Sequence, residues 1–264
     1  MEILIPVLIL GGLGLLFGAG LAIASRTISV KSDHRLEAVH SLLPGSNCGA
    51  CGGAGCFGFA ENLLSGKLPL EACRMSTEQI KEKIAALLGT KFEKKVKTIA
   101  VLHCNGGSKV KDRFIYQGIE DCVSADLVLG GQKQCRWGCL GFATCVKVCP
   151  FGAIVMSKEN LPLVDKNKCK ACNKCVKACP KHLFSLVPII HDVYVACSSH
   201  DSGKETKAAC PVGCIACGIC TKVKDSPFYL KESLSYIDYK NATHKAALDE
   251  ARAKCPTKCI LKRD

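Results

Sequence analysis

The residues with the clearest chemistry are the cysteines, which number 21 in a chain of 264 residues. The strongest motif is CKACNKCVKACP, a C-x2-C-x2-C-x3-C-P run that contains Cys169, Cys172, Cys175, Cys179 and Pro180. In bacterial ferredoxins such runs occur in pairs, and the fourth cysteine of each run ligates the cluster of the other. The chemistry that this motif predicts is the binding of a [4Fe–4S] cluster.

A partner run, CLGFATCVKVCP, lies upstream, with Cys149 as its closing cysteine. The crossover rule predicts one cluster on Cys149, Cys169, Cys172 and Cys175. The second cluster lacks a ligand, because Phe142 occupies the second cysteine position of the partner run. We expect Cys135, in CRWGC, to complete the set of Cys135, Cys139, Cys145 and Cys179. A three-iron cluster or a non-thiolate ligand is the alternative.

A third cysteine-rich block is a degenerate copy of this pattern. Its run CIACGIC supplies three cysteines, but Lys224 stands at the fourth position. Cys255, before Pro256, is a closing cysteine, and residues such as Asn241 and Ala247 occupy the positions of a second triplet. The missing cysteines are those of a single cluster under the crossover rule. The block therefore predicts one remaining cluster, held by Cys214, Cys217, Cys220 and Cys255.

The first cysteine group is NCGACGGAGC followed by a distant cysteine, in C-x2-C-x4-C-x16-C spacing. Its glycines allow the backbone to wrap closely and to direct N–H groups at sulfur atoms. A helix from Ser76 to Leu88 should follow, with Ser76 and Gln79 as a capping box and Gly89 as its stop. The group predicts a further cluster on Cys48, Cys51, Cys56 and Cys73.

Five cysteines have no recognisable register, namely Cys104, Cys122, Cys197, Cys210 and Cys259. Four of them could ligate a fifth cluster, and buried free thiols are the alternative. Zinc is the general alternative for CxxC repeats, but structural zinc sites usually pair one CxxC with a second pair a dozen or more residues away. The seven histidines share no ligand spacing and are expected to be structural or exposed.

The elements that must position these cysteines begin with an uncharged segment from Ile3 to Ser25. It is long enough to cross a hydrocarbon core of about 30 Å as a helix. A cleaved signal peptide is the alternative, because Ala22 to Ala24 resembles a cleavage site. Basic residues follow the segment and only Glu2 is charged before it, which predicts a single-pass anchor in the inner (cytoplasmic) membrane, with the soluble part on the cytoplasmic side. Cytoplasmic thiols favour metal or cluster ligation over disulfides.

The fold class expected is α+β, with one transmembrane helix, a small helical four-cysteine domain and bacterial ferredoxin-like [4Fe–4S] domains. A strand is expected over 98–103, and QCRWGCLGFATC and ACPVGCIACGIC form a rough internal repeat that indicates duplicated modules. The expected domains are an anchor (1–30), a four-cysteine domain (31–90), a connector (91–134), a two-cluster domain (135–190) and a degenerate one-cluster domain (191–264).

The formal net charge of +13 first suggests an acidic partner, nucleic acid or an anionic membrane. Each [4Fe–4S] core with four thiolates carries a charge of about −2, so four clusters on 16 cysteines reduce the total to about +5. The charge therefore no longer favours a zinc-rich nucleic-acid binder. Lysines in 91–111 and 166–177 could instead steer an acidic protein partner; solvated lysines without a partner are the alternative.

Together these motifs resemble the B subunits of Rnf complexes, the membrane-bound ferredoxin:NAD⁺ oxidoreductases that pump Na⁺ or H⁺. The resemblance rests on the anchor, LLPGSNCGACGGAGCFGFAE (42–61), CRWGCLGFATCVKVCPFGAI (135–154) and CKACNKCVKACPK (169–181). The chain departs from the family pattern at 74–76, after Cys73, and in its eroded last repeat, which leaves the total number of clusters open.

The resemblance implies a non-autonomous electron-transfer subunit of an ion-translocating enzyme. It would accept electrons from soluble ferredoxin, or flavodoxin, and relay them through four or five [4Fe–4S] clusters to the other Rnf subunits. No GxGxxG after a strand, P-loop or nucleophile motif is present. The alternative is an electron-transfer subunit of a membrane-bound hydrogenase or formate dehydrogenase, although the CGACGGAGC group favours the Rnf type.

Overall fold

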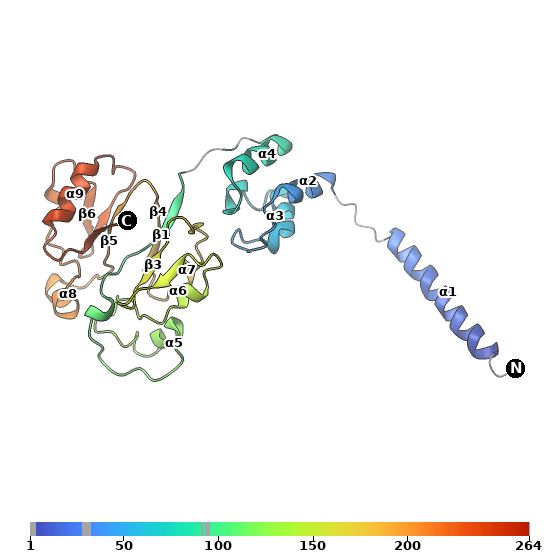
Figure 1. Cartoon of the computed structure of the whole chain (residues 1–264), viewed down its shortest axis with the longest axis horizontal. Helices are drawn as coiled ribbons and strands as arrows, with labels where there is room; N and C mark the ends of the chain where they lie inside the picture. The colour runs from blue at the N-terminus through green and yellow to red at the C-terminus, as the bar shows by residue number, and fades with distance from the viewer. Residues whose placement is uncertain (1–3, 28–32, 91, 93–95, 264) are drawn as a thin grey trace.

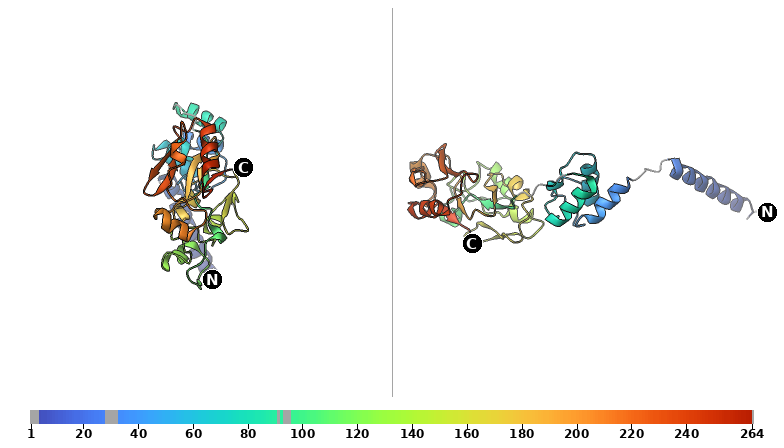
Figure 2. Two further views of the ribbon diagram at one scale, coloured as in Figure 1. Left: turned by 90° about the vertical axis from the view of Figure 1, so that its left-hand side faces the viewer. Right: turned by 90° about the horizontal axis from the view of Figure 1, so that it is seen from above.

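The computed structural model describes residues 4–27, 33–90, 92 and 96–263. An N-terminal helix, a small helical unit and a larger part of mixed helix and strand follow one another along the chain (Figure 1). The same succession is seen from above in Figure 2. This mixed helix and strand content, with one apolar N-terminal helix, agrees with the α+β class expected from the sequence.

Helix α1 (Leu4–Thr27) contains 24 residues, and its stretch from Val7 to Ser25 has a mean hydropathy of 2.3. Its apolar side chains, including Leu8, Leu15 and Phe17, are exposed in the isolated chain. A helix of this length and composition can cross a membrane. The helix coincides with the uncharged segment from which the anchor is expected.

The helical unit consists of α2 (His34–Leu42), α3 (Gly55–Leu64), the 3-10 helix η1 (Leu70–Ala72) and α4 (Glu78–Leu88). Val39, Phe59 and Ile84, one from each α-helix, are almost fully buried in its core. Gly89 ends α4 in the left-handed conformation, as expected. The N-cap, however, is Thr77, whose side chain accepts a hydrogen bond from the N–H of Ile80. Ser76 is buried instead.

The first module, residues 98–188, is built on two antiparallel strand pairs. The outer strands β1 (Thr98–Leu102) and β4 (Phe184–Pro188) pair with Thr98 opposite Pro188, and β2 (Ile154–Met156) pairs with β3 (Pro162–Val164). Between the strands lie η2 (Gly107–Lys109), α5 (Cys122–Leu127), α6 (Thr144–Lys147) and α7 (Lys174–Ala178). Strand β1 and helix α5 come from residues expected to form a connector, so this segment is part of the module.

The second module, residues 193–262, repeats this plan. Its outer strands β5 (Val193–Val195) and β8 (Ile260–Lys262) pair antiparallel, as do β6 (Phe228–Lys231) and β7 (Leu234–Ile237). Its helices are α8 (Gly203–Ala209), η3 (Cys220–Lys222) and α9 (Lys245–Lys254). Outer strands of distant sequence and an inner hairpin therefore occur in both modules, in accord with the internal repeat.

The two modules meet at His103, which follows β1. Its Nδ1 lies 2.7 Å from the carbonyl oxygen of Val195 and its Nε2 lies 2.6 Å from Oγ of Ser185. Burial lowers the pKa of this imidazole. Ser198 donates a hydrogen bond back to the carbonyl oxygen of His103 at 2.9 Å. The junction is thus a polar, hydrogen-bonded contact, and His103 has a structural role in it.

Candidate functional site

The three cysteine loops of the modules, residues 139–145, 169–175 and 214–220, share one backbone pattern. In each loop the residues two and four places after the first cysteine have positive φ, and they are Gly141 (86°), Ala143 (59°), Ala171 (51°), Asn173 (68°), Ala216 (53°) and Gly218 (71°). Residues in this left-handed conformation, within a turn, direct successive N–H groups toward one concave side, which suits anionic sulfur. The strain of four non-glycine residues at positive φ follows from this wrapping.

The cavity beside the second of these loops is lined by four thiols, those of Cys149, Cys169, Cys172 and Cys175. The backbone N–H of Ala153 donates to Sγ of Cys149 at 3.4 Å. Burial raises the pKa of the Cys175 thiol to about 12. The structure therefore brings together the four cysteines that the crossover rule predicts. In these buried surroundings a thiolate would need a bound cation to stabilise its charge.

A second cavity lies beside the first loop and is lined by Cys122, Cys139, Cys145 and Cys179. The N–H of Leu183 donates to Sγ of Cys179 at 3.5 Å. Burial also raises the pKa of Cys145 to about 12. Three of these cysteines belong to the expected set, but the fourth is Cys122, and Cys135 does not line this cavity.

Helix α5 explains why Cys122 takes the place expected for Cys135. Asp121 caps α5, and its carboxylate accepts a hydrogen bond from Oγ1 of Thr144 at 2.7 Å. The N–H of Cys122 donates to the same Oγ1 at 2.8 Å, so Cys122 is fixed beside the loop that contains Cys145. Phe142, at the second cysteine position, packs against Tyr116 with ring centroids 5.3 Å apart. No spacing rule could have identified Cys122.

A third cavity, in the second module, is lined by five cysteines: Cys214, Cys217, Cys220, Cys255 and Cys259. The first four are the expected set, and Cys259 is an additional member. Sγ of Cys259 lies 3.7 Å from Sγ of Cys255. Hydrogen bonds from the Cys259 thiol lower the pKa of Cys255 and that of Cys214. The thiol of Cys259 therefore favours the thiolate forms of Cys214 and Cys255 in this cavity.

Two of the four cysteines of the helical unit lie at the start of α3 and at the end of η1. Cys56 lies in the first turn of α3, and its N–H donates to Oδ1 of Asn47 at 2.7 Å. Sγ of Cys73 lies 3.0 Å from the buried Oγ of Ser76, which explains why Ser76 does not cap α4. Cys51, Cys56 and Cys73 are part of, or packed against, the core of this unit, whereas Cys48 is at its edge.

The remaining cysteines share a fourth cavity at the module junction. Cys104, Cys135, Cys197 and Cys210 all line it. Cys135 is thus grouped with three of the five cysteines that have no register in the sequence. One signal was available, because Cys135 and Cys210 occupy the same place in the internal repeat QCRWGC and ACPVGC.

The donor sets of these cavities fit iron–sulfur clusters, which four cysteine thiolates hold. Each cavity combines thiols from separate segments with N–H groups that point at sulfur. Among the residues that the structure describes, no three side chains of His, Cys, Asp or Glu converge closely enough to bind a single metal ion.

Comparison with family models identifies three iron–sulfur regions in the chain. Residues 43–75 match the family described as "Putative Fe-S cluster", residues 133–184 match a 4Fe-4S dicluster domain, and residues 211–261 match the 4Fe-4S single cluster domain of ferredoxin I. The dicluster match covers residues 133–184 of the first module, and the single-cluster match covers residues 211–261 of the second module. Iron–sulfur clusters are therefore the cofactors of this chain.

Whole-chain comparison gives relatives that align along most of this chain. The chain is 41% identical to the B subunit of the Na⁺-translocating ferredoxin:NAD⁺ oxidoreductase complex of Acetobacterium woodii, over 98% of this chain and 78% of that protein. It is 37% identical to the B subunit of the ion-translocating oxidoreductase complex of Methanosarcina acetivorans, over 96% and 95%. It is 36% identical to the B subunit of the proton-translocating ferredoxin:NAD⁺ oxidoreductase complex of Clostridium ljungdahlii, over 94% and 88%. The chain belongs to the family of B subunits of Rnf-type, ion-translocating oxidoreductase complexes.

Proposed function

We propose that this chain is the membrane-anchored electron-transfer subunit of an Rnf-type ferredoxin:NAD⁺ oxidoreductase, and that it accepts electrons from reduced ferredoxin for the membrane partners of the complex. The observation that supports it most directly is the succession of thiol-lined cavities through both modules. When bound there, [4Fe–4S] clusters supply one-electron redox chemistry at potentials that burial and N–H donors to sulfur adjust. We assign the sites of four clusters to the helical unit, the two cavities of the first module and the cavity of the second.

Contacts within the chain keep neighbouring sites adjacent. Nζ of Lys174 donates to the carbonyl oxygen of Cys48 at 3.1 Å, which joins the loop of the helical unit to the loop of Cys172 and Cys175. Helix α7 contains Cys175, which lines one cavity of the first module, and ends before Cys179, which lines the other. The protein therefore fixes the order and the proximity of its binding sites, which is its main contribution to electron transfer.

The soluble part is proposed to lie on the cytoplasmic side of the inner membrane. Arg26, Lys31 and Arg35 follow the apolar segment, whereas Glu2 is the only charged side chain before it. This asymmetry agrees with the positive-inside rule. Lys31 lies outside the described residues, and Arg35 pairs with Asp33 at 2.9 Å.

Surface lysines favour an acidic electron donor such as ferredoxin or flavodoxin. Of the lysines singled out in the sequence, six are exposed: Lys97, Lys109, Lys111, Lys166, Lys168 and Lys177. Lys91, Lys94 and Lys95 lie outside the described residues. Lys166 and Lys168 precede Cys169 by three residues and one, so their charge lies near a thiol-lined cavity along the chain. Electrostatic attraction would raise the rate at which the donor docks more than it raises the affinity of the donor for this chain.

Anaerobic mixing with reduced ferredoxin tests this function in the intact complex. We expect ferredoxin to bleach the visible absorption of the clusters, whereas hydrogen and formate do not. The double variant Lys166→Glu/Lys168→Glu should slow the reduction about tenfold at low salt, and high salt should remove the difference. Lys207→Glu, at an exposed position of α8, is the matched control and should be unchanged. Reduction by hydrogen or formate alone would contradict the proposal.

A further inference from the structure

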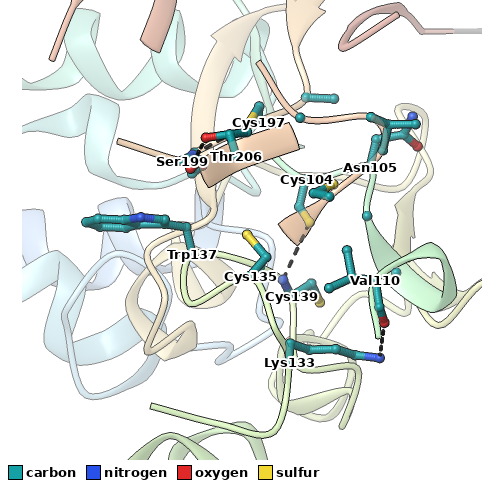
Figure 3. Close-up of a pocket in the computed structure, with 18 residues that line it drawn as sticks. Cys104, Asn105, Val110, Lys133, Cys135, Trp137, Cys139, Cys197, Ser199 and Thr206 are labelled. Carbon is teal, nitrogen blue, oxygen red and sulfur yellow. Dashed lines mark hydrogen bonds between the residues drawn. The ribbon is translucent and has the colours of Figure 1, made fainter. Parts of the chain in front are cut away.

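The junction cavity brings together four cysteines that the four assigned sites do not use. Cys104 and Cys135 belong to the first module, and Cys197 and Cys210 belong to the second. In Figure 3, a dashed line joins Cys104 to the backbone nitrogen of Cys139. Cys135 and Cys210 are only 9% and 7% exposed. This burial keeps the cavity largely shielded from water.

Each module contributes the same two positions to this cavity. Cys104 lies two residues after β1, and Cys197 lies two residues after β5. Cys135 and Cys210 each lie four residues before the first cysteine of a loop, Cys139 and Cys214 respectively. The four thiols are therefore related by the duplication that relates the two modules, so their meeting follows from the way in which the modules pack.

The backbone donors to these sulfur atoms repeat as well. The N–H of Cys139 donates to Sγ of Cys104 at 3.4 Å, and the backbone of Cys214 makes the equivalent hydrogen bond to Cys197. The backbone of Trp137 is hydrogen-bonded to Cys135. Val212, also two residues further along the chain, makes the same contact with Cys210. All four sulfur atoms accept backbone hydrogen bonds, an arrangement that stabilises metal-bound thiolates.

Other features of the cavity suit an anionic group. Lys133 lines it with only 11% of its side chain exposed, and its Nζ lies 3.0 Å from Asp112. A Cβ at Gly106 would lie 3.6 Å from Sγ of Cys210 and 3.7 Å from Sγ of Cys104, so these two sulfur atoms flank a backbone without a side chain. An ion pair between Arg136 and Asp201 joins the two modules close to the cavity, since Arg136 lies between the lining residues Cys135 and Trp137.

The geometry points to a fifth [4Fe–4S] site held by Cys104, Cys135, Cys197 and Cys210, two ligands from each module. Its sulfur atoms are hydrogen-bonded to Cys139 on one side and to Cys214 on the other, and these are cysteines of the two neighbouring cavities. The site would therefore connect the first module to the second. Its role in electron transfer rests on the proposed function, but its capacity to bind a cluster does not.

The site predicts the iron content of the full-length chain in detergent, reconstituted anaerobically with iron and sulfide. We expect about 20 iron atoms per chain for five sites, against about 16 for four. Cys210→Ala should remove about four iron and four sulfide, whereas Val212→Ala, in the same loop, should remove none. Electron paramagnetic resonance of the remaining clusters serves as the test of folding.

Double variants show whether Cys135 serves the same site as Cys210 or a different site. Cys135→Ala/Cys210→Ala should lose no more iron than Cys210→Ala, because both ligands serve one site. Cys122→Ala/Cys210→Ala should lose about eight, because two sites are affected. Any of three results would overturn the assignment. They are unchanged iron in Cys210→Ala, the loss of one zinc ion in place of iron, and the loss of eight iron atoms in Cys135→Ala/Cys210→Ala. If Cys210→Ala fails to fold, the count for the unmodified chain decides. Filled sites that ferredoxin does not reduce would contradict the proposed function alone.

Discussion

In the first module, the segment between β3 and β4 forms a cysteine loop and the five-residue helix α7, whereas the corresponding segment of the second module forms the ten-residue helix α9. Helix α7 buries Cys175, a thiol that lines a cavity. Helix α9 instead buries Ala247, Leu248 and Ala251 against the strands of its module. Apolar packing thus takes the place that a thiol-lined cavity has in the first module.

This difference shows two ways of completing the same fold. Helices as short as α7 are unstable in isolation, so contacts at the cavity must stabilise it. Helix α9 is longer and has an apolar face, and the burial of that face stabilises the helix without a cluster. We infer that the first module depends on its clusters for stability more than the second does. The two modules should therefore respond unequally to the loss of iron and to substitutions.

Removal of iron should produce the largest difference in stability between the two modules. After anaerobic chelation of the full-length chain, amide exchange in β1 and β4 should accelerate about 100-fold or more, because buried thiols no longer have a bound cation to link them. Exchange in α9 should accelerate about tenfold at most. Hydrogen–deuterium exchange with mass spectrometry measures both. Equal acceleration in β4 and α9 would mean that the modules do not differ in this respect.

The shared conformation of the three loops can be tested at Phe142. Cys122→Ala should lose about four iron atoms, because a cavity of the first module then has three thiols. Phe142→Cys in that background should restore them, since Gly141 and Ala143 have the backbone conformation that accepts a cysteine in the other two loops. Iron and acid-labile sulfide analysis measures the rescue.

Cys122→Ala/Phe142→Ala is the matched control, because it removes the phenyl ring without adding a thiol. Iron should stay low in this control. Similar iron contents in the two double variants would show that the first loop does not have the ligand geometry of the others.

The apolar core of α9 predicts a smaller effect that is confined to the second module. Leu248, which is 1% exposed, packs in this core, and Leu248→Ala should destabilise α9 by about 2–5 kcal/mol. Native-state hydrogen exchange of α9 measures the free energy of opening. The exposed Lys245→Ala, in the first turn of α9, is the control and should change it by less than about 0.5 kcal/mol. A loss of iron from the first module in Leu248→Ala would contradict the prediction that the effect is confined to the second module.

The sequence predicted what depends on local spacing. The C-x2-C-x2-C run and the closing cysteine before proline define the thiols that surround the cavity of Cys149 and Cys175, and the structure brings that set together. The loss of a triplet in the second module could likewise be inferred from residues such as Ala247, which is buried in α9.

The sequence could not predict groupings that depend on tertiary contacts. Cys122 reaches its cavity because Asp121 and Thr144 hold α5 in place, and Cys104 reaches the junction because β1 pairs with β4. Neither contact has a signature in the spacing of cysteines. The expectation that Ser76 caps a helix is wrong for a related reason, since its hydroxyl contacts a cysteine sulfur atom, and the capping pattern does not encode that contact.

The pairing of β1 with β4 also determines when the protein can mature during synthesis. Strand β1 leaves the ribosome well before β4, and the partners of Cys104 in the second module, Cys197 and Cys210, emerge later still. The nascent chain therefore exposes reactive thiols that have no completed site. Because free thiolates oxidise readily, the cell must deliver iron and sulfide before oxidants reach these cysteines. The yield of active protein should depend on the timing of cluster assembly relative to translation.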